Sequence, residues 1–141
     1  CWFPEPVGAY DCYRAEMADP VLLNRAQPQL QRITARVSAT RRDRLTARLP
    51  MLSPPHAEGT LGGLRVEVRG VRAGMRHVEI VGIAERVATI TGSVAAQAAR
   101  ALSKGLVAPG VHNMGQDAVP NDFILDGVLD SGTILHQFIG R

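Results

Sequence analysis

Alternation of apolar and charged residues dominates the centre of the chain. Residues 64–70 carry aliphatic side chains at the even positions and charged side chains at most odd positions, which is the period of a half-buried β-strand. Residues 77–85 also alternate at their start, and Ala73 and Gly74 lie between the two stretches. Because glycine accepts a positive φ without steric cost, this pattern predicts a β-hairpin with its turn at residues 73–74.

Similar patterns predict the remaining elements. Three further strands are expected at residues 7–14, 30–38 and 133–139. Three helices are expected: one from Thr40 to Pro50, one at residues 91–105 and one at residues 120–131. Strands in pairs with helices between them indicate an α+β fold. We expect a mixed, mainly antiparallel β-sheet with helices packed on one face.

The same patterns assign side chains to the two faces of that sheet. We expect a buried aliphatic face against a helix, formed by Ile33, Val37, Val66, Val68, Val78 and Ile80 on the strands and Val94, Ala98, Ala101 and Leu102 on the helix. We expect an open, charged face formed by Arg32, Arg36, Arg65, Arg69, His77 and Glu79. Such an open face would be the place for a partner subunit, a substrate or another domain.

Length and composition indicate one globular domain over residues 1–141. The chain is 45% hydrophobic and 21% charged, and it contains no apolar run of the length that a membrane span requires. The first residues lack the basic start and apolar stretch of a secretory signal. We therefore expect a cytoplasmic protein with no membrane association.

The formal charge of +3 raises the question of nucleic-acid binding. The strongest basic cluster is Arg41, Arg42, Arg44 and Arg48 on the helix expected from Thr40. It is either a solvated helix face or a phosphate-binding stripe. Acidic residues interrupt the basic ones elsewhere, and aromatic side chains for base stacking are few. The expectation is therefore no nucleic-acid partner.

Residues with catalytic or metal-binding potential are scattered. Cys1 and Cys12 are too few for a disulfide framework or a zinc site, and Cys1 marks a chain boundary, a processed nucleophile or a lipidated residue. The four histidines lack metal-ligand spacing, and His56 with Glu58 is too small a group for a metal site. No phosphate-binding or dinucleotide-binding glycine motif is present. We expect no catalytic, cofactor-binding or metal-binding residue in this chain.

Several stretches together resemble the C-terminal domain of the saccharopine dehydrogenase-like family. They are residues 3–8 (Phe-Pro-Glu-Pro-Val-Gly), the hairpin 64–83 with Val-Arg-Gly-Val-Arg-Ala-Gly at its centre, residues 91–105 with Pro-Gly-Val at 109–111, and residues 120–138. They cover most of the chain in the family's order. Residues 13–24 and 112–115 differ from the family's pattern, so the substrate stays unassigned.

The resemblance implies the C-terminal part of a larger two-domain oxidoreductase. In that arrangement an N-terminal dinucleotide-binding domain, absent from this chain, holds NAD or NADP. This domain then supplies walls for a small-molecule substrate and a homo-oligomer contact, and it is not catalytic alone. The alternative is a free-standing ligand-binding or protein-interaction module without a catalytic parent.

A carboxylate-bearing substrate would need cationic and hydrogen-bonding side chains near the first strand. Tyr13, Arg14 and Glu16 are the candidate substrate-binding residues. The alternative is a surface arginine beside a core tyrosine.

Overall fold

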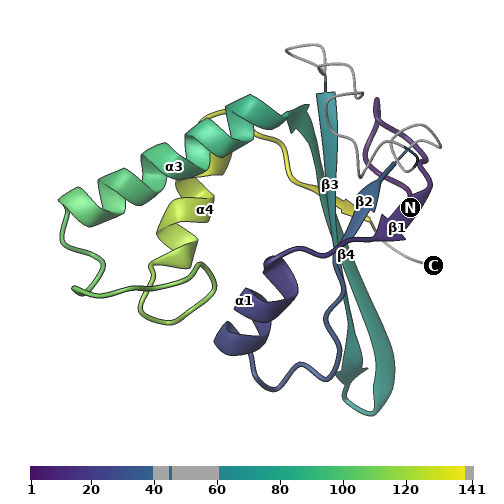
Figure 1. The fold of residues 1–141 in the computed structure, drawn as a ribbon, viewed down its shortest axis with the longest axis horizontal. Helices are drawn as coiled ribbons and strands as arrows, with labels where there is room; N and C mark the ends of the chain where they lie inside the picture. Colours follow the sequence, from purple (N-terminus) through teal and green to yellow (C-terminus); the bar gives the residue numbers. More distant parts are fainter. Residues whose placement is uncertain (40–44, 46–60, 139–141) are drawn as a thin grey trace.

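The computed structural model describes residues 1–39, 45 and 61–138. Its elements in chain order are β1 Cys12–Arg14, α1 Asp19–Ala26, β2 Arg36–Ser38, β3 Leu61–Arg72, β4 Met75–Arg86, α3 Val87–Ser103, α4 Asn121–Asp130 and β5 His136–Phe138. Apart from Leu45, the helix expected from Thr40 lies outside the described residues, as do Arg41, Arg42, Arg44, Arg48, His56 and Glu58. The fold is α+β, as expected. Figure 1 shows the three labelled helices on one side of the β3–β4 hairpin and β1 and β2 on the other.

The strands of the described residues form two antiparallel sheets, which corrects the single sheet expected from the sequence. β1 pairs with β2, and β3, β4 and β5 form a three-stranded sheet with β4 in the middle. The first two strands are shorter than the expected 7–14 and 30–38, and helix α1 lies between them. Pro20 lies in the first turn of α1, where the fixed φ of proline favours a helix start. The sequence interpretation placed a strand end or turn there.

A two-residue turn determines which side chains share a face of the long hairpin. Ala73 and Gly74 have φ of 51° and 77°, the pattern of the tight turns that match strand twist. Arg72 pairs with Met75, so every even-numbered residue of β3 lies opposite an odd-numbered residue of β4. Residues directly opposite each other in an antiparallel pair project to the same face.

This register overturns the predicted faces. Val66 lies opposite Val81 and shares its face, whereas Val78 lies opposite Arg69 on the other face. Val66 is 47% exposed, and the buried aliphatic residue on its face is Ile83, which lies nearer the helices along β4. The helices therefore cover only the base of the hairpin. His77 and Glu79 lie on the face of Val66 rather than on that of Arg65.

The buried core lies mainly between the helices. Ala101 of α3 and Ile124 and Val128 of α4 are buried, together with Val119 before α4. Helix α3 begins at Val87, earlier than the expected start at Thr91, and α4 matches the expected helix closely. Leu102 was expected to face the sheet but is 64% exposed.

The N-terminal segment packs on the hairpin through two glycines. A Cβ atom at Gly63 would lie 2.8 Å from the ring of Phe3, and one at Gly82 would lie 2.9 Å from Pro4. Gly63 and Gly82 project to the same face of the hairpin as Arg65. These glycines allow the N-terminal residues to approach the sheet backbone closely.

Candidate functional site

Two of the three predicted substrate-binding residues lie in β1. Tyr13 lies opposite Val37 and Arg14 lies opposite Arg36. Because successive residues of a strand project to opposite faces, the side chains of Tyr13 and Arg14 point to different sides of the β1–β2 sheet. Glu16 follows β1 and is exposed. The structure thus places Arg14 beside an arginine of the neighbouring strand and away from Tyr13.

Arg14 and Arg36 form the pair with the closer side-chain spacing. The amide of Ala15 donates a hydrogen bond to the carbonyl oxygen of Ala35 at 3.3 Å. Ala15 and Ala35, which lie next to Arg14 and Arg36 along the two strands, are therefore a hydrogen-bonded pair. Pair types alternate along an antiparallel ladder, so Arg14 and Arg36 form a non-hydrogen-bonded pair, in which opposite Cα atoms are about 4.5 Å apart. The side chains of Arg14 and Arg36 are therefore neighbours on one face of the β1–β2 sheet.

No described carboxylate neutralises this arginine pair. The ion pairs among the described residues involve Glu67 and Glu79, and neither reaches Arg14 or Arg36. Both arginines are exposed, and Ser38 is a polar, exposed neighbour of Arg36 in β2. Sequence reasoning placed Arg36 on an open face but did not include it in the site. Finding it required the pairing of β1 with β2, which no local pattern specifies.

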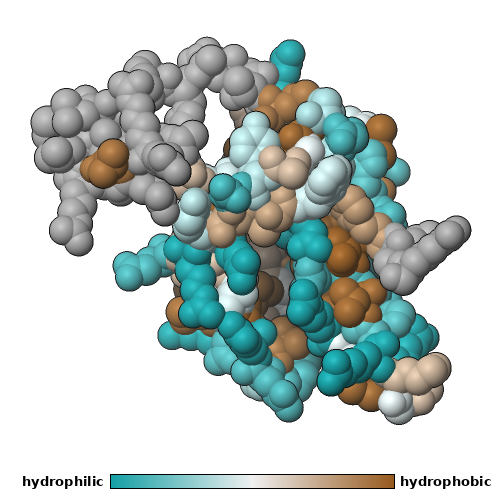
Figure 2. All heavy atoms as spheres, turned by 90° about the vertical axis from the view of Figure 1, so that its right-hand side faces the viewer, coloured by the Kyte–Doolittle hydropathy of each residue, from teal (hydrophilic) through white to brown (hydrophobic). Residues whose placement is uncertain are grey.

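The distal half of the β3–β4 hairpin forms an exposed arm, defined here as residues 68–79. Every residue of the arm is exposed, including the apolar Val71 at 73% and Met75 at 70%. In Figure 1 the turn end of the hairpin projects away from α3 and α4. Figure 2 shows hydrophobic side chains open to solvent between hydrophilic ones on the side of the molecule that carries β1 and β2. A two-stranded hairpin of this kind is marginally stable in water without a covering surface.

One face of the arm combines positive charge with apolar side chains. Arg69 lies opposite Val78, and Val71 lies opposite Arg76, so these four residues share a face. Both valines are exposed, as are both arginines. Arg76 has no ion pair among the described residues. This arm face is suited to a surface that is acidic and partly apolar.

Glu67 is the acidic residue at the base of that face. It accepts a hydrogen bond from Arg69 and forms an ion pair with Arg65 at 2.6 Å. The hydrogen bond from Arg69 and the neighbouring Arg65 hold the pKa of Glu67 below its ordinary value, although partial burial acts in the opposite direction. The Glu67 carboxylate is therefore ionised and stabilised by two arginines.

Helix α4 presents a row of carboxylates. Asp122, Asp126 and Asp130 are four residues apart, so they lie along one side of the helix, and all three are exposed. Leu125 lies beside them and is 46% exposed. None of these aspartates has an ion-pair partner among the described residues. The outer side of α4 is thus acidic and partly apolar.

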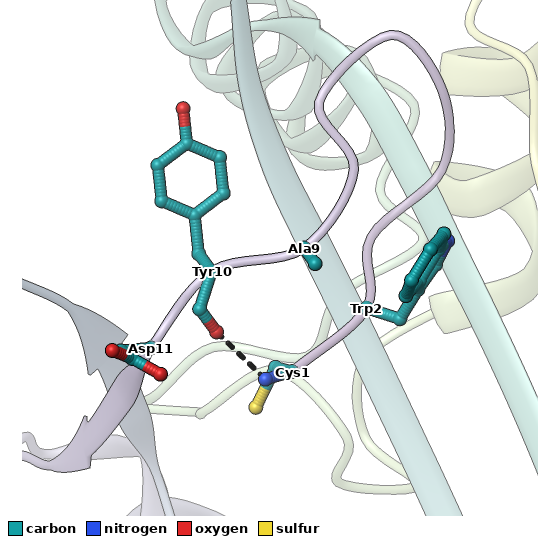
Figure 3. Close-up of a pocket in the computed structure, with 5 residues that line it drawn as sticks. All are labelled: Cys1, Trp2, Ala9, Tyr10 and Asp11. Atoms are coloured by element: carbon teal, nitrogen blue, oxygen red, sulfur yellow. Dashed lines mark hydrogen bonds between the residues drawn. The ribbon is translucent and has the colours of Figure 1, made fainter.

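A surface hollow at the N-terminal segment has a volume of about 470 Å³. Figure 3 shows its lining residues, Cys1, Trp2, Ala9, Tyr10 and Asp11, with the Trp2 and Tyr10 side chains pointing in different directions. The Cys1 amino group donates a hydrogen bond to the carbonyl oxygen of Tyr10 at 2.7 Å. These contacts are mainly backbone pairing, because Trp2 and Ala9 form a β-bridge. A second, smaller hollow is lined by Pro20, Val21, Asn24, Leu30, Gln31 and Ile33.

Metal-binding and membrane-spanning features are absent from the part of the chain that the structure describes. There, no group of three His, Cys, Asp or Glu side chains is arranged to hold a metal ion. The described helices include none that is both long and apolar enough to cross a membrane. His77 pairs with Glu79 at 2.9 Å on the exposed arm.

Comparison of the chain with protein-family models, curated proteins and solved structures finds no match. The resemblance to the saccharopine dehydrogenase-like family thus rests on the sequence stretches alone.

Proposed function

We propose that this chain is the substrate-binding and oligomerisation domain of a cytoplasmic NAD(P)-dependent oxidoreductase related to saccharopine dehydrogenase. In this proposal the dinucleotide is held by a separate N-terminal domain, and the chain is not catalytic alone. The single observation that carries the assembly role is the arm, in which every residue is exposed, including the apolar Val71 at 73% and Met75 at 70%. The arginine pair of the β1–β2 sheet supports the substrate-binding role.

The occupant of the arm is a second copy of the chain. The arm face with Arg69 and Arg76 is basic and apolar, and the outer side of α4 with Asp126 and Leu125 is acidic and apolar. Opposite charges on the two surfaces favour their association and disfavour other orientations. Each copy carries both surfaces, so two copies exchange arms around a two-fold axis, the commonest symmetry of soluble dimers.

The dimensions of the arm are sufficient for such an exchange. Five cross-strand pairs at about 3.4 Å per residue give an arm roughly 17 Å long. A standard interface buries about 800 Å² on each partner. Two reciprocal arms lying on two α4 helices provide contact on this scale, and they cover the apolar side chains that water otherwise surrounds.

Sedimentation equilibrium of the chain between 1 and 200 μM tests the assembly role. We expect a monomer–dimer equilibrium, which the pair of arm substitutions Val71→Ser and Val78→Ser shifts to monomer. Val21→Ser in α1 is the matched control, because Val21 is also an exposed aliphatic residue but lies outside both surfaces. A monomer at 200 μM, or a dimer that the arm substitutions leave unchanged, contradicts the proposal.

Calorimetric titration of the same chain with NADH and with NADPH tests the division of labour between domains. We expect no micromolar binding, because no dinucleotide-binding glycine motif is present in the sequence. Micromolar binding of either cofactor would place the nucleotide site in this chain and contradict that part of the proposal.

A further inference from the structure

The arginine pair of the β1–β2 sheet has an electrostatic cost that the described residues do not offset. Like charges directly opposite each other on two strands destabilise their pairing. Arg14 and Arg36 occupy such positions in the β1–β2 sheet, which has only three residue pairs among the described residues. They form a non-hydrogen-bonded pair, in which opposite side chains are closer than in a hydrogen-bonded pair. No described carboxylate lies within 4.0 Å of either guanidinium group. An anion bound between the two groups would convert this repulsion into attraction.

The surroundings of the pair favour a polar ligand. On the same face, Cys12 lies opposite Ser38. The hydroxyl group of Ser38, two residues from Arg36 in β2, can donate a hydrogen bond. The apolar side chains of this sheet, such as Val37, project to the opposite face.

We propose that Arg14 and Arg36 together bind the oxyanion group of a small dianionic ligand, either a phosphate monoester or a dicarboxylate. Each guanidinium presents a planar fork of N–H donors, which matches two oxygens of a carboxylate or phosphate group. Two neighbouring cations favour a ligand with two negative charges over a monoanion. The identification of this ligand as a substrate rests on the proposed function, whereas the binding itself does not.

Amide NMR spectra of the ¹⁵N-labelled chain test the binding. Inorganic phosphate and succinate are titrated separately, with sodium chloride adjusted so that the ionic strength stays constant. We expect saturable shifts of amide signals from β1 and β2 with at least one of the two anions. Saturation by phosphate alone assigns a phosphate group, and saturation by succinate alone assigns a dicarboxylate. Saturation by both assigns the shared oxyanion chemistry. Linear shifts with both, equal to those with sodium chloride, overturn the proposal.

Substitution of Arg36 tests the residues. We expect Arg36→Gln to weaken the binding at least tenfold, and Arg36→Lys, which keeps the charge but loses the fork, to weaken it less. Arg25→Gln is the matched control, because Arg25 is an exposed arginine in the last turn of α1 and has no arginine opposite it. Unchanged binding by Arg36→Gln overturns the proposal. If the Arg36→Gln variant shows no amide signals from β1 and β2, its binding cannot be measured there. In that case, unchanged binding by Arg36→Lys overturns the proposal.

The anion titration and the sedimentation experiment fail independently. The arginine pair lies on the β1–β2 sheet, and the proposed dimer contacts lie on the arm and α4. Loss of anion binding with an intact dimer removes the ligand site alone. Anion binding by a monomeric chain removes the assembly role alone.

Discussion

The side-chain amide of Gln97 donates a hydrogen bond to the carbonyl oxygen of Gly127 at 3.1 Å, which joins α3 to α4. Arg100 donates a second hydrogen bond to the Gln97 side-chain oxygen at 2.8 Å. A Cβ atom at position 127 would lie less than 3.0 Å from three atoms of this amide. Glycine inside α4 thus makes room for a buried polar link, at the cost of helix propensity.

Replacement of Gly127 by Ala should therefore lower stability even though alanine favours helix. Alanine adds about 1 kcal/mol of helix propensity. The displaced Gln97 amide loses two hydrogen bonds, worth about 1 kcal/mol each, and its buried polar atoms are left without partners. The expected net loss in the free energy of unfolding is about 1–2 kcal/mol, measured by urea denaturation.

A double-mutant cycle separates the two effects. In a Gln97→Ala background the obstruction is gone, so Gly127→Ala should be neutral or stabilising by up to about 1 kcal/mol. If Gly127→Ala has the same effect in both backgrounds, the close approach of Gln97 does not explain the glycine.

A second prediction contrasts two aliphatic positions on the same face of the hairpin, Ile83 and Val66. Ile83 is 8% exposed, so Ile83→Asp places an uncompensated charge in the core and should abolish cooperative unfolding. Val66 is on the same face of the hairpin as Ile83 but is half-exposed, so Val66→Asp should leave the fold intact. Circular dichroism during thermal unfolding distinguishes the two variants. Loss of the fold in Val66→Asp would show that this face is covered.

The contrast between Val66 and Ile83 marks the limit of prediction from alternation. The pattern identified both strands of the hairpin and its turn, because alternation and a glycine-containing turn are local signals. Which residues share a face depends on register, and a two-residue turn places odd positions of β4 opposite even positions of β3. Which part of that face is buried depends on how far the helices reach, and no local pattern carries this information.

The candidate site shows the same division between local and long-range information. Arg14 could be selected from the sequence as a cation near the first strand, but its partner Arg36 is more than 20 residues away in sequence. Helix α1 between them was missed, although Pro20 and Asp19 are typical of a helix start. The arm and the row of aspartates on α4 become complementary only once both surfaces are known to be exposed.

The pH dependence of stability should depend on Glu67. Its pKa is lowered in the folded chain, chiefly by the hydrogen bond from Arg69, so the ionised form stabilises the fold. The stabilisation is fully present above the ordinary pKa of 4.5 and is lost as the pH falls through the lower folded value. We expect Glu67→Gln to be less stable than the parent at pH 7 and to approach it in stability as the pH falls below 4.5, as measured by urea denaturation.

Glu79→Gln provides the control for this pH effect. Glu79 is more exposed than Glu67 and pairs only with His77 among the described residues. Its substitution should change the pH profile less than Glu67→Gln does. Equal profiles for the two variants would mean that the two arginines around Glu67 do not stabilise its charge.

Charge reversal tests the proposed exchange of arms at single residues. Arg76→Glu places a negative charge on the arm, and Asp126→Arg places a positive charge on α4. Each change puts like charges together twice in a two-fold dimer, so each should weaken the dimer at least tenfold. Arg25→Glu in α1 is the control for a change of net charge and should leave the dimer intact.

Mixing the two reversed variants is the most demanding test of this arrangement. In a mixed pair, the negative arm of Arg76→Glu meets the positive α4 of Asp126→Arg, and the unaltered arm meets the unaltered α4. Both contacts are then attractive, whereas each variant alone has two repulsive contacts. Native mass spectrometry of the mixture should therefore detect heterodimers from two variants that are monomeric separately. If the mixture stays monomeric, or if heterodimers form no more readily than either homodimer, the arm does not lie on α4 of the partner.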